Sequence, residues 1–172
     1  MVRYGSDGVC NLVGVIQRRF DKSVLEYYHL KPVGEPKSDI FIPVNNEALT
    51  SKLYKVLTAD EVIAIIREAP NTDTIWIEND RLRAERYKEV ISGSDRTALI
   101  QMIRALYSRR QTQQSSKKNL RAPDQQFLKN AEKLLYDEFA YALGIEREMV
   151  LQFIFEQIEL SDSSDISNLN EE

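Results

Sequence analysis

The sequence predicts an α+β protein with a small β domain at the N-terminus and an all-helical domain after it. Two observations support this prediction. Residues 1–46 contain short runs of alternating apolar side chains, bounded by turn-forming residues, which is typical of antiparallel strands. From about residue 47 the apolar side chains recur every three to four positions, which is typical of amphipathic helices. At 172 residues the chain is long enough for two small domains, each with a core.

The N-terminal segment predicts four strands, at residues 2–4, 9–19, 24–31 and 39–44. Residues 20–23 are expected to form a hairpin turn, and residues 32–38, which hold two prolines and a glycine, a loop. Short strands joined by tight turns favour a small, strongly bent sheet or barrel.

Helical periodicity predicts a short connecting helix at residues 48–56, followed by helices with recognisable ends. Thr58 followed by Glu61 matches a capping box. The other expected terminal residues are Asn79 or Asp80, Asp95, Pro123 and Gly144. The domain boundary is placed near residue 70, which gives domains at 1–70 and 71–160. Residues 161–172 are acidic and rich in serine and asparagine, so a disordered tail is expected there.

The charge of the chain is unevenly distributed. The whole sequence carries a net charge of −4, but residues 81–121 contain eleven basic and three acidic residues. This segment therefore carries +8, and the rest of the chain −12. A local excess of cations is a better indication of an anionic partner than the overall charge.

Residues 74–86 (TIWIENDRLRAER) contain the only tryptophan, Trp76, just before a predicted helix with Arg81, Arg83 and Arg86. A large apolar side chain next to cations can open a stacked base step while the cations hold phosphate. Trp76 can equally be a core residue at the domain junction, with the arginines on a solvated face. The residues alone leave both interpretations open.

The chain contains no pattern typical of an enzyme active site. The GxGxxG and GxxxxGK[ST] patterns are absent, and the single His29 and single Cys10 lie far apart in sequence. Acidic residues such as Glu61 and Glu138 are expected to be helix caps or solvated. A binding protein without a cofactor or metal is therefore predicted. The lone cysteine, with neither a leader nor a long apolar run, predicts a cytoplasmic protein that does not enter a membrane.

Six stretches follow one another over essentially residues 2–155. They are YGSDGVC (4–10), EYYHLK (26–31), IFIPVNN (40–46), WIENDRLRAERYKEVISGSD (76–95), MIRALYSRR (102–110) and AEKLLYDEFAYALGI (131–145). In this order they resemble the CarD family of bacterial transcription regulators. The N-terminal half is also similar to the polymerase-binding module of the transcription-repair coupling factor.

This resemblance implies a Tudor-like β-barrel that docks on the β subunit of RNA polymerase, and a helical domain that contacts promoter DNA. The DNA contact would lie at the upstream edge of the melted bubble, where an inserted tryptophan modulates the stability of the open complex. RNA polymerase and promoter DNA are thus the expected partners, and a monomer is expected. The alternative is a protein–protein adaptor whose helical domain binds another protein.

The resemblance also implies site residues. Arg18 matches a polymerase-contacting arginine, while Phe41 stands where the family has a second, basic contact, next to Ile42 and Pro43. The family's tryptophan position falls on Asn79, three residues after Trp76, so either Trp76 is the wedge or the wedge is lost. The expected DNA-contacting residues are Trp76, Asn79, Arg81, Arg83, Arg86, Arg104, Arg109, Arg110, Lys117 and Lys118.

Overall fold

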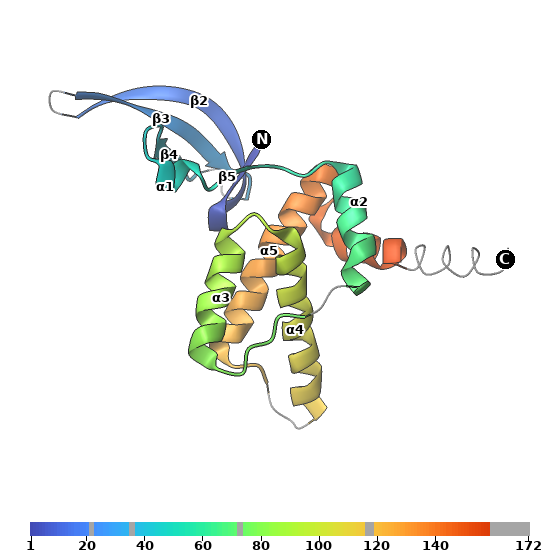
Figure 1. The fold of residues 1–172 in the computed structure, drawn as a ribbon. Helices are drawn as coiled ribbons and strands as arrows, with labels where there is room; N and C mark the ends of the chain where they lie inside the picture. The colour runs from blue at the N-terminus through green and yellow to red at the C-terminus, as the bar shows by residue number, and fades with distance from the viewer. Residues whose placement is uncertain (21–22, 35–36, 72–73, 116–118, 159–172) are drawn as a thin grey trace.

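The protein has an antiparallel sheet at one end of a helical domain (Figure 1). The computed structural model describes residues 1–20, 23–34, 37–71, 74–115 and 119–158. The strands are β1 (Val2–Tyr4), β2 (Gly8–Phe20), β3 (Ser23–Pro32), β4 (Ile40–Pro43) and β5 (Leu53–Lys55). They form one sheet in the order β4-β3-β2-β1-β5. Strands followed by helices confirm the predicted α+β class.

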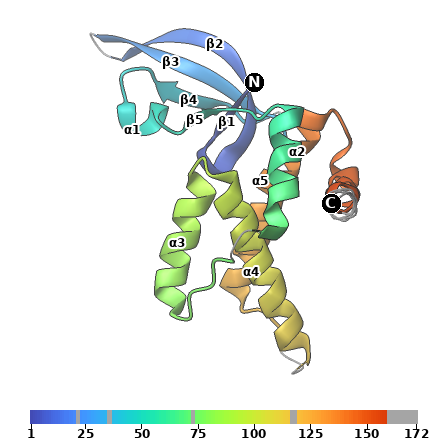
Figure 2. The same ribbon diagram turned by 45° about the vertical axis from the view of Figure 1, so that its right-hand side comes forward.

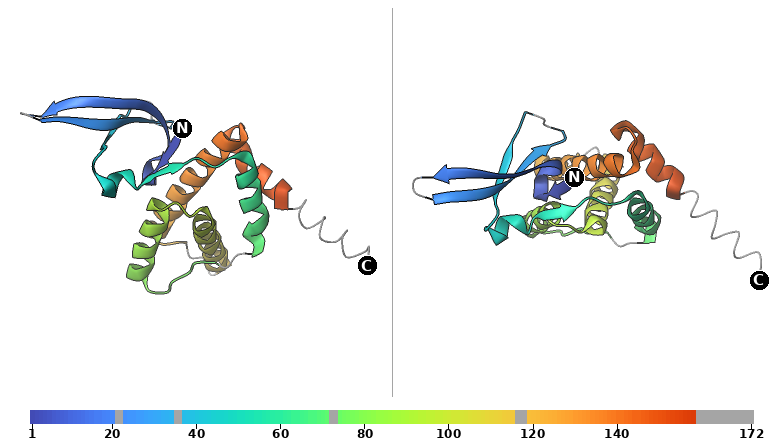
Figure 3. Two further views of the ribbon diagram at one scale, coloured as in Figure 1. Left: turned by 45° about the horizontal axis from the view of Figure 1, so that its top comes forward. Right: turned by 90° about the horizontal axis from the view of Figure 1, so that it is seen from above.

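The longest part of the sheet is the β2–β3 hairpin, which curves away from the helices (Figure 3). Its register runs from Cys10 opposite Pro32 to Phe20 opposite Ser23, so the predicted hairpin is confirmed. A register shift between Leu12 and Gly14 interrupts the pairing, an irregularity that bends a strand. In the part of the chain that the structure describes, no ladder joins β4 to β5. The Tudor-like barrel stays a prediction.

The predicted helix at residues 48–56 is confirmed only at residues 48–50 and is wrong after them. Helix α1 covers only Glu47–Thr50, and its first turn is capped by the Asn46 side chain, which accepts from the Leu49 amide at 3.2 Å. The chain then forms β5, which pairs antiparallel with β1. The first strand has a second edge whose backbone groups need partners. This tertiary requirement outweighs the local helical pattern.

The helical domain is built from α2 (Ala59–Glu68), α3 (Asp80–Ser92), α4 (Arg96–Ser115) and α5 (Ala122–Leu143), with residues 150–158 also helical (Figure 2). Short 3₁₀ turns η1 (Gly5–Asp7), η2 (Ala69–Asn71) and η3 (Arg147–Met149) lie between elements. The predicted ends are confirmed by cap contacts or backbone conformation. Thr58 and Glu61 form the capping box, and Asn79 and Asp95 accept from first-turn amides. Gly144 ends α5 with a left-handed backbone.

Each domain has its own hydrophobic cluster. Tyr4, Cys10, Leu30 and Ile42 form the centre of the β domain. Helix α2 contributes Val62 and Ile66 to the separate cluster of the helical domain, and Ala69 of η2 joins them. Helix α2 therefore packs with the helical domain, and the boundary near residue 70 stays a prediction. The predicted tail at 161–172 lies outside the described residues.

The two domains meet at buried charges. Arg96 at the start of α4 donates to both carboxylate oxygens of Glu138, from Nε at 3.0 Å and from Nη2 at 2.6 Å. Arg3 on β1 lies against the same carboxylate, its Nε 3.8 Å from Oε2. Glu138 is only 1% exposed, so the expectation that it is solvated is wrong. Its burial requires charged partners, and these come from distant parts of the sequence.

Candidate functional site

The segment that precedes α3 is fastened to the helices by side chains that donate to its carbonyl groups. Tyr87 Oη donates to the Ile75 carbonyl at 2.9 Å, and Arg83 Nη1 donates to the Ile77 carbonyl at 2.6 Å. Burial raises the pKa of the Tyr87 hydroxyl to about 12, so it remains a donor at neutral pH. These bonds fix the path of residues 74–79 on the helical domain.

Arg83 is held inside the helical domain and was expected to contact DNA. Its guanidinium forms a bidentate pair with Asp124 at the start of α5, from Nε at 3.1 Å and from Nη2 at 3.0 Å. Nη2 also donates to Asp80 at 2.8 Å. Because Arg83 is 4% exposed, its charge serves the fold and is not offered to a partner.

Trp76 is seated among these groups. Its ring packs against the helical core, with the guanidinium carbons of Arg83 and Arg109 at 4.4 and 5.0 Å from the ring centroid. Its Nε1 donates to the Glu78 carboxylate at 2.9 Å. An indole with two cation–π neighbours and a satisfied N–H is a packed side chain. These contacts favour the alternative in which Trp76 is a packing residue.

Exposed arginines lie in the first half of α3, in the last turns of α4 and at the start of α5. These parts of the helices are at the end of the helical domain furthest from the sheet (Figures 1 and 2). Arg81 is 85% exposed and pairs with Glu85 at 3.2 Å, and Arg86 pairs with Glu89 at the same distance. Such exposed pairs are weak, so these arginines can exchange a carboxylate for another anion. We call this surface the basic end; its residues are the exposed Arg81, Leu82, Arg86, Arg110 and Arg121, with the partly buried Arg109 beside them.

The remaining expected DNA-contacting residues have different surroundings, and of those discussed next only Arg110 belongs to the basic end. Arg110 lies over the Tyr107 ring at 4.7 Å, on the last turns of α4. Arg104 turns toward η2, where it donates to the Ala69 and Pro70 carbonyls. Asn79 is the cap of α3. Lys117 and Lys118 lie outside the described residues.

Two residues of the basic end were missed by sequence reasoning. Leu82, in the first turn of α3, is 52% exposed between Arg81 and Arg86. Arg121 forms an ion pair with Asp80 across the starts of α5 and α3. Leu82 could be recognised only once Arg83 and Tyr87 were known to be buried, because it lies on a different side of α3 from these two residues.

The two outer residues expected to contact polymerase come together on the β domain. The guanidinium carbon of Arg18 on β2 lies 3.7 Å from the Phe41 ring centroid on β4, so its side chain reaches across β3. His29 on β3 stacks on the same ring, with centroids 4.8 Å apart. Pro43, two residues on, shares the outer face with Phe41, whereas Ile42 between them points inward and is a core residue.

A charged pair borders this surface, which we call the outer β face (Arg18, His29, Phe41 and Pro43). His29 Nε2 lies 2.6 Å from Asp39 Oδ1, and Lys31 lies 3.8 Å from the same oxygen. The hydrogen bond from His29, reinforced by nearby cations, lowers the pKa of the Asp39 carboxyl. The face therefore combines an aromatic ring, a stacked cation and a polar rim.

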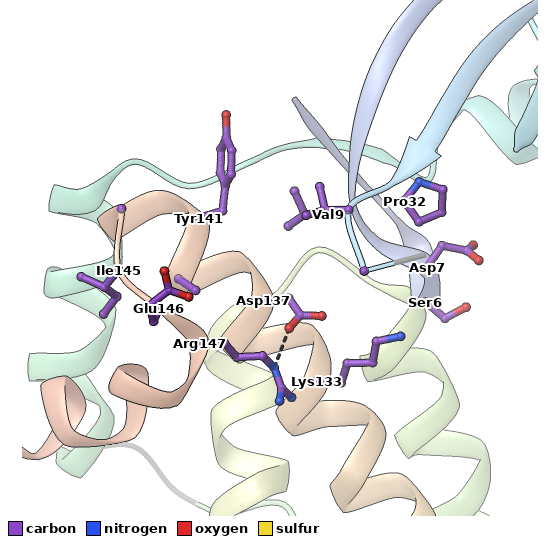
Figure 4. Close-up of a pocket in the computed structure, with 14 residues that line it drawn as sticks. Ser6, Asp7, Val9, Pro32, Lys133, Asp137, Tyr141, Ile145, Glu146 and Arg147 are labelled. Atoms are coloured by element: carbon purple, nitrogen blue, oxygen red, sulfur yellow. Dashed lines mark hydrogen bonds and ion pairs between the residues drawn. The ribbon is translucent and has the colours of Figure 1, made fainter. Parts of the chain in front are cut away.

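A cleft of about 640 Å³ separates the β domain from the end of α5 (Figure 4). Asp137 and Arg147 pair across its helical wall at 2.6 Å, and Asp7 and Lys133 are among the other charges that line it. Among the described residues no group of histidine, cysteine and carboxylate side chains is arranged to hold a metal ion. No described helix is long and apolar enough to cross a membrane.

Fold and surfaces together define a two-domain α+β protein that offers an aromatic, cationic face on its sheet and a basic end on its helices. Residues 61–155, more than half of the chain, match the family described as CarD, C-terminal domain. The chain belongs to the CarD family, which gives it a role related to transcription and points to an interaction with RNA polymerase. A search among curated proteins found no match.

Proposed function

We propose that this protein is a non-enzymatic transcription regulator that binds the β subunit of RNA polymerase and contacts promoter DNA at the upstream edge of the bubble. Through these two contacts it modulates the stability of the open complex. The observation that carries the proposal is the position of the outer β face and the basic end at far ends of one molecule that belongs to the CarD family (Figure 1).

Arg18 and Phe41 support the polymerase contact. A guanidinium that rests on a partly exposed aromatic ring gives a surface with apolar area and a directed charge, and aromatic residues and arginine are enriched at protein interfaces. Phe41→Glu in the full-length chain is expected to abolish capture of polymerase on immobilised protein. Val15→Glu is the matched control, because Val15 is exposed on the opposite face of β2. Equal capture by both variants would remove this contact from the proposal.

The basic end supports the DNA contact. Arginines that carry only exposed partners can neutralise phosphates, and Leu82 between them has the size and apolar character of side chains that enter the minor groove at a base step. Packed Trp76 leaves Leu82 as the apolar side chain we propose for insertion. The contact is expected to be weak and salt-sensitive on DNA alone and to depend on polymerase for specificity.

Open-complex lifetime on a promoter with purified polymerase tests the proposal. Wild-type protein is expected to change the lifetime, and Arg81→Glu with Arg86→Glu to lose that effect while polymerase binding is kept. Leu82→Ala is expected to give a partial loss. Lys52→Glu, a reversal of an exposed charge on the β domain, is the control. A wild-type protein without any effect on lifetime would overturn the proposal.

A protein–protein adaptor is the second candidate function. An apolar groove of about 380 Å³ lies between α2, α4, α5 and residues 150–158, and its rim exposes Leu151 and Phe155. Exposed apolar side chains around a groove are typical of a surface that binds protein. The adaptor predicts that charge reversal at the basic end leaves promoter activity unchanged and that Phe155→Asp removes it.

A further inference from the structure

Several contacts between the two domains are hydrogen bonds from a side chain of one domain to the backbone of the other. Arg3 on β1 donates to the carbonyl groups at the end of α3, from Nη1 to Gly93 at 3.0 Å and from Nη2 to Ile91 at 3.4 Å. A single guanidinium thus fixes the first strand against the turn between α3 and α4. Arg3 is 1% exposed, so water does not compete for these bonds.

The same cluster bonds to the chain where it leaves the sheet. Arg96 Nη2 donates to the Lys55 carbonyl on β5 at 3.3 Å, and the Leu57 amide donates to Glu138 Oε1 at 3.3 Å. The Glu138 carboxylate therefore accepts from Arg96 and from the linker between β5 and α2, with Arg3 beside it. We call Arg3, Arg96 and Glu138 the junction triad.

The buried charges of the junction triad favour one orientation of the two domains. Hydrogen bonds to buried charges depend on direction as well as distance, and removal of one partner leaves an uncompensated charge. Burial, with the nearby charge of Arg96, lowers the pKa of Arg3 to about 10, and its Nε has no hydrogen-bond acceptor among the described residues. A small rotation of one domain against the other would break these hydrogen bonds and leave further buried polar groups without partners. Apolar surfaces, in contrast, can slide over one another without losing such bonds.

Apolar packing does less to fix the angle between the domains. The two hydrophobic clusters have separate cores, and the cleft in Figure 4 opens between the β domain and α5. Asp137, next to Glu138 on α5, already faces this cleft. Domains joined by a small or partly open interface are expected to move relative to one another unless specific bonds prevent it.

We propose that Glu138 is a positioning residue: through Arg3 and Arg96 it locks the sheet to the helices at one angle, so that the outer β face and the basic end keep a fixed separation. The lock itself is independent of any partner. Its role in transcription rests on the proposed function, because a fixed separation raises the effective concentration of the second contact once the first has formed.

The distance between the domains tests the lock. Spin labels are placed at Val24→Cys on the hairpin and Lys129→Cys on α5, with Cys10→Ala, and distance distributions are measured by pulsed electron resonance. Arg3→Met removes the β-domain charge and leaves the Arg96–Glu138 pair balanced; Glu138→Gln is the second variant. Each is expected to broaden the distribution about twofold. Asp124→Asn, which weakens a buried pair inside the helical domain, is the control and is expected to leave the width unchanged.

Each outcome has a defined meaning. An unchanged distribution in folded Arg3→Met and Glu138→Gln overturns the lock, whatever polymerase does. If the distribution broadens, the role in transcription predicts that Arg3→Met requires roughly threefold more protein for the same effect on open-complex lifetime. No change in that requirement would overturn the transcription role. A wild-type protein without effect on the lifetime overturns the proposed function instead and leaves the distance result intact.

Discussion

The outer β face and the interior of the helical domain use arginine in opposite ways. On the sheet, Arg18 lies over an aromatic ring and keeps its charge at the surface. On the helices, Arg83 and Arg96 are both buried in carboxylate pairs, although they belong to the segment that carries +8 in the sequence. The difference shows that cations clustered in a sequence fall into two groups. Structural arginines are buried in carboxylate pairs, whereas available arginines are exposed, and only the available ones can act on a partner.

Removal of a structural arginine gives the largest expected effect. Arg83→Met is expected to lower the free energy of unfolding by about 3–5 kcal/mol, because it leaves the Asp124 carboxylate buried without its partner. Urea denaturation measures this. Arg81→Met in the same helix, where the side chain is exposed, is expected to change stability by less than about 0.5 kcal/mol. Equal losses would contradict the division between structural and available arginines.

Trp76 packs against Arg83 and Arg109, so its substitution is a second test of which side chains serve the fold. Trp76→Ala is expected to cost about 2–3 kcal/mol of unfolding free energy, since the ring is partly buried against the helical core. Trp76→Phe keeps most of the apolar contact and is expected to cost less. Thermal or urea unfolding of both variants gives the values. A stable Trp76→Ala protein would restore the exposed-wedge interpretation.

Available arginines are expected to affect binding and to leave stability nearly unchanged. Arg110→Ala is expected to weaken DNA binding in the polymerase complex and to reduce the magnitude of its salt dependence by about one unit, the value for one lost phosphate contact. The measurement is the affinity across a series of salt concentrations. A loss of affinity with the same salt slope would assign Arg110 to packing on Tyr107.

The smallest expected effect concerns the polar rim of the outer β face. The bond from His29 lowers the pKa of Asp39, so the folded state favours the ionised carboxylate. Its stabilising contribution is present above the ordinary pKa of 3.8 and is lost as pH falls through the lower pKa of the folded protein. A carboxyl titration by nuclear magnetic resonance is expected to show a rise in the pKa of Asp39 in His29→Ala. Because the Asp39 carboxyl is exposed, its bond with His29 contributes little to stability.

Local signals predicted much of this fold. The capping box at Thr58 and Glu61, the cap at Asn79 and the end of α5 at Gly144 each depend on residues a few positions apart. Strand β5 could not be predicted in the same way, because its three residues are extended only where β1 offers an edge. The reading of a local pattern fails where a distant segment supplies the partner.

The candidate surfaces also contain residues that a local pattern predicts and residues whose placement depends on a distant partner. Strand alternation is enough to place Phe41 outside and Ile42 inside once the strand is known. The burial of Arg83 could not be inferred, because its partner Asp124 is on another helix and each residue alone is typical of a solvated helix face. Exposure of the remaining cations at the basic end became visible only after these pairs were known.

Because the chain is synthesised from its N-terminus, the residues of the junction triad are made in a fixed order. β1 leaves the ribosome with the Arg3 guanidinium long before the carboxylate of Glu138 on α5 has been added to the chain. Domains tend to fold as they emerge, so the sheet can begin to pair with β5 while this cation still faces solvent. The two domains can become one body only after α5 has been made and closes the contact. A truncated chain that stops before α5 would therefore carry a sheet without its anchor.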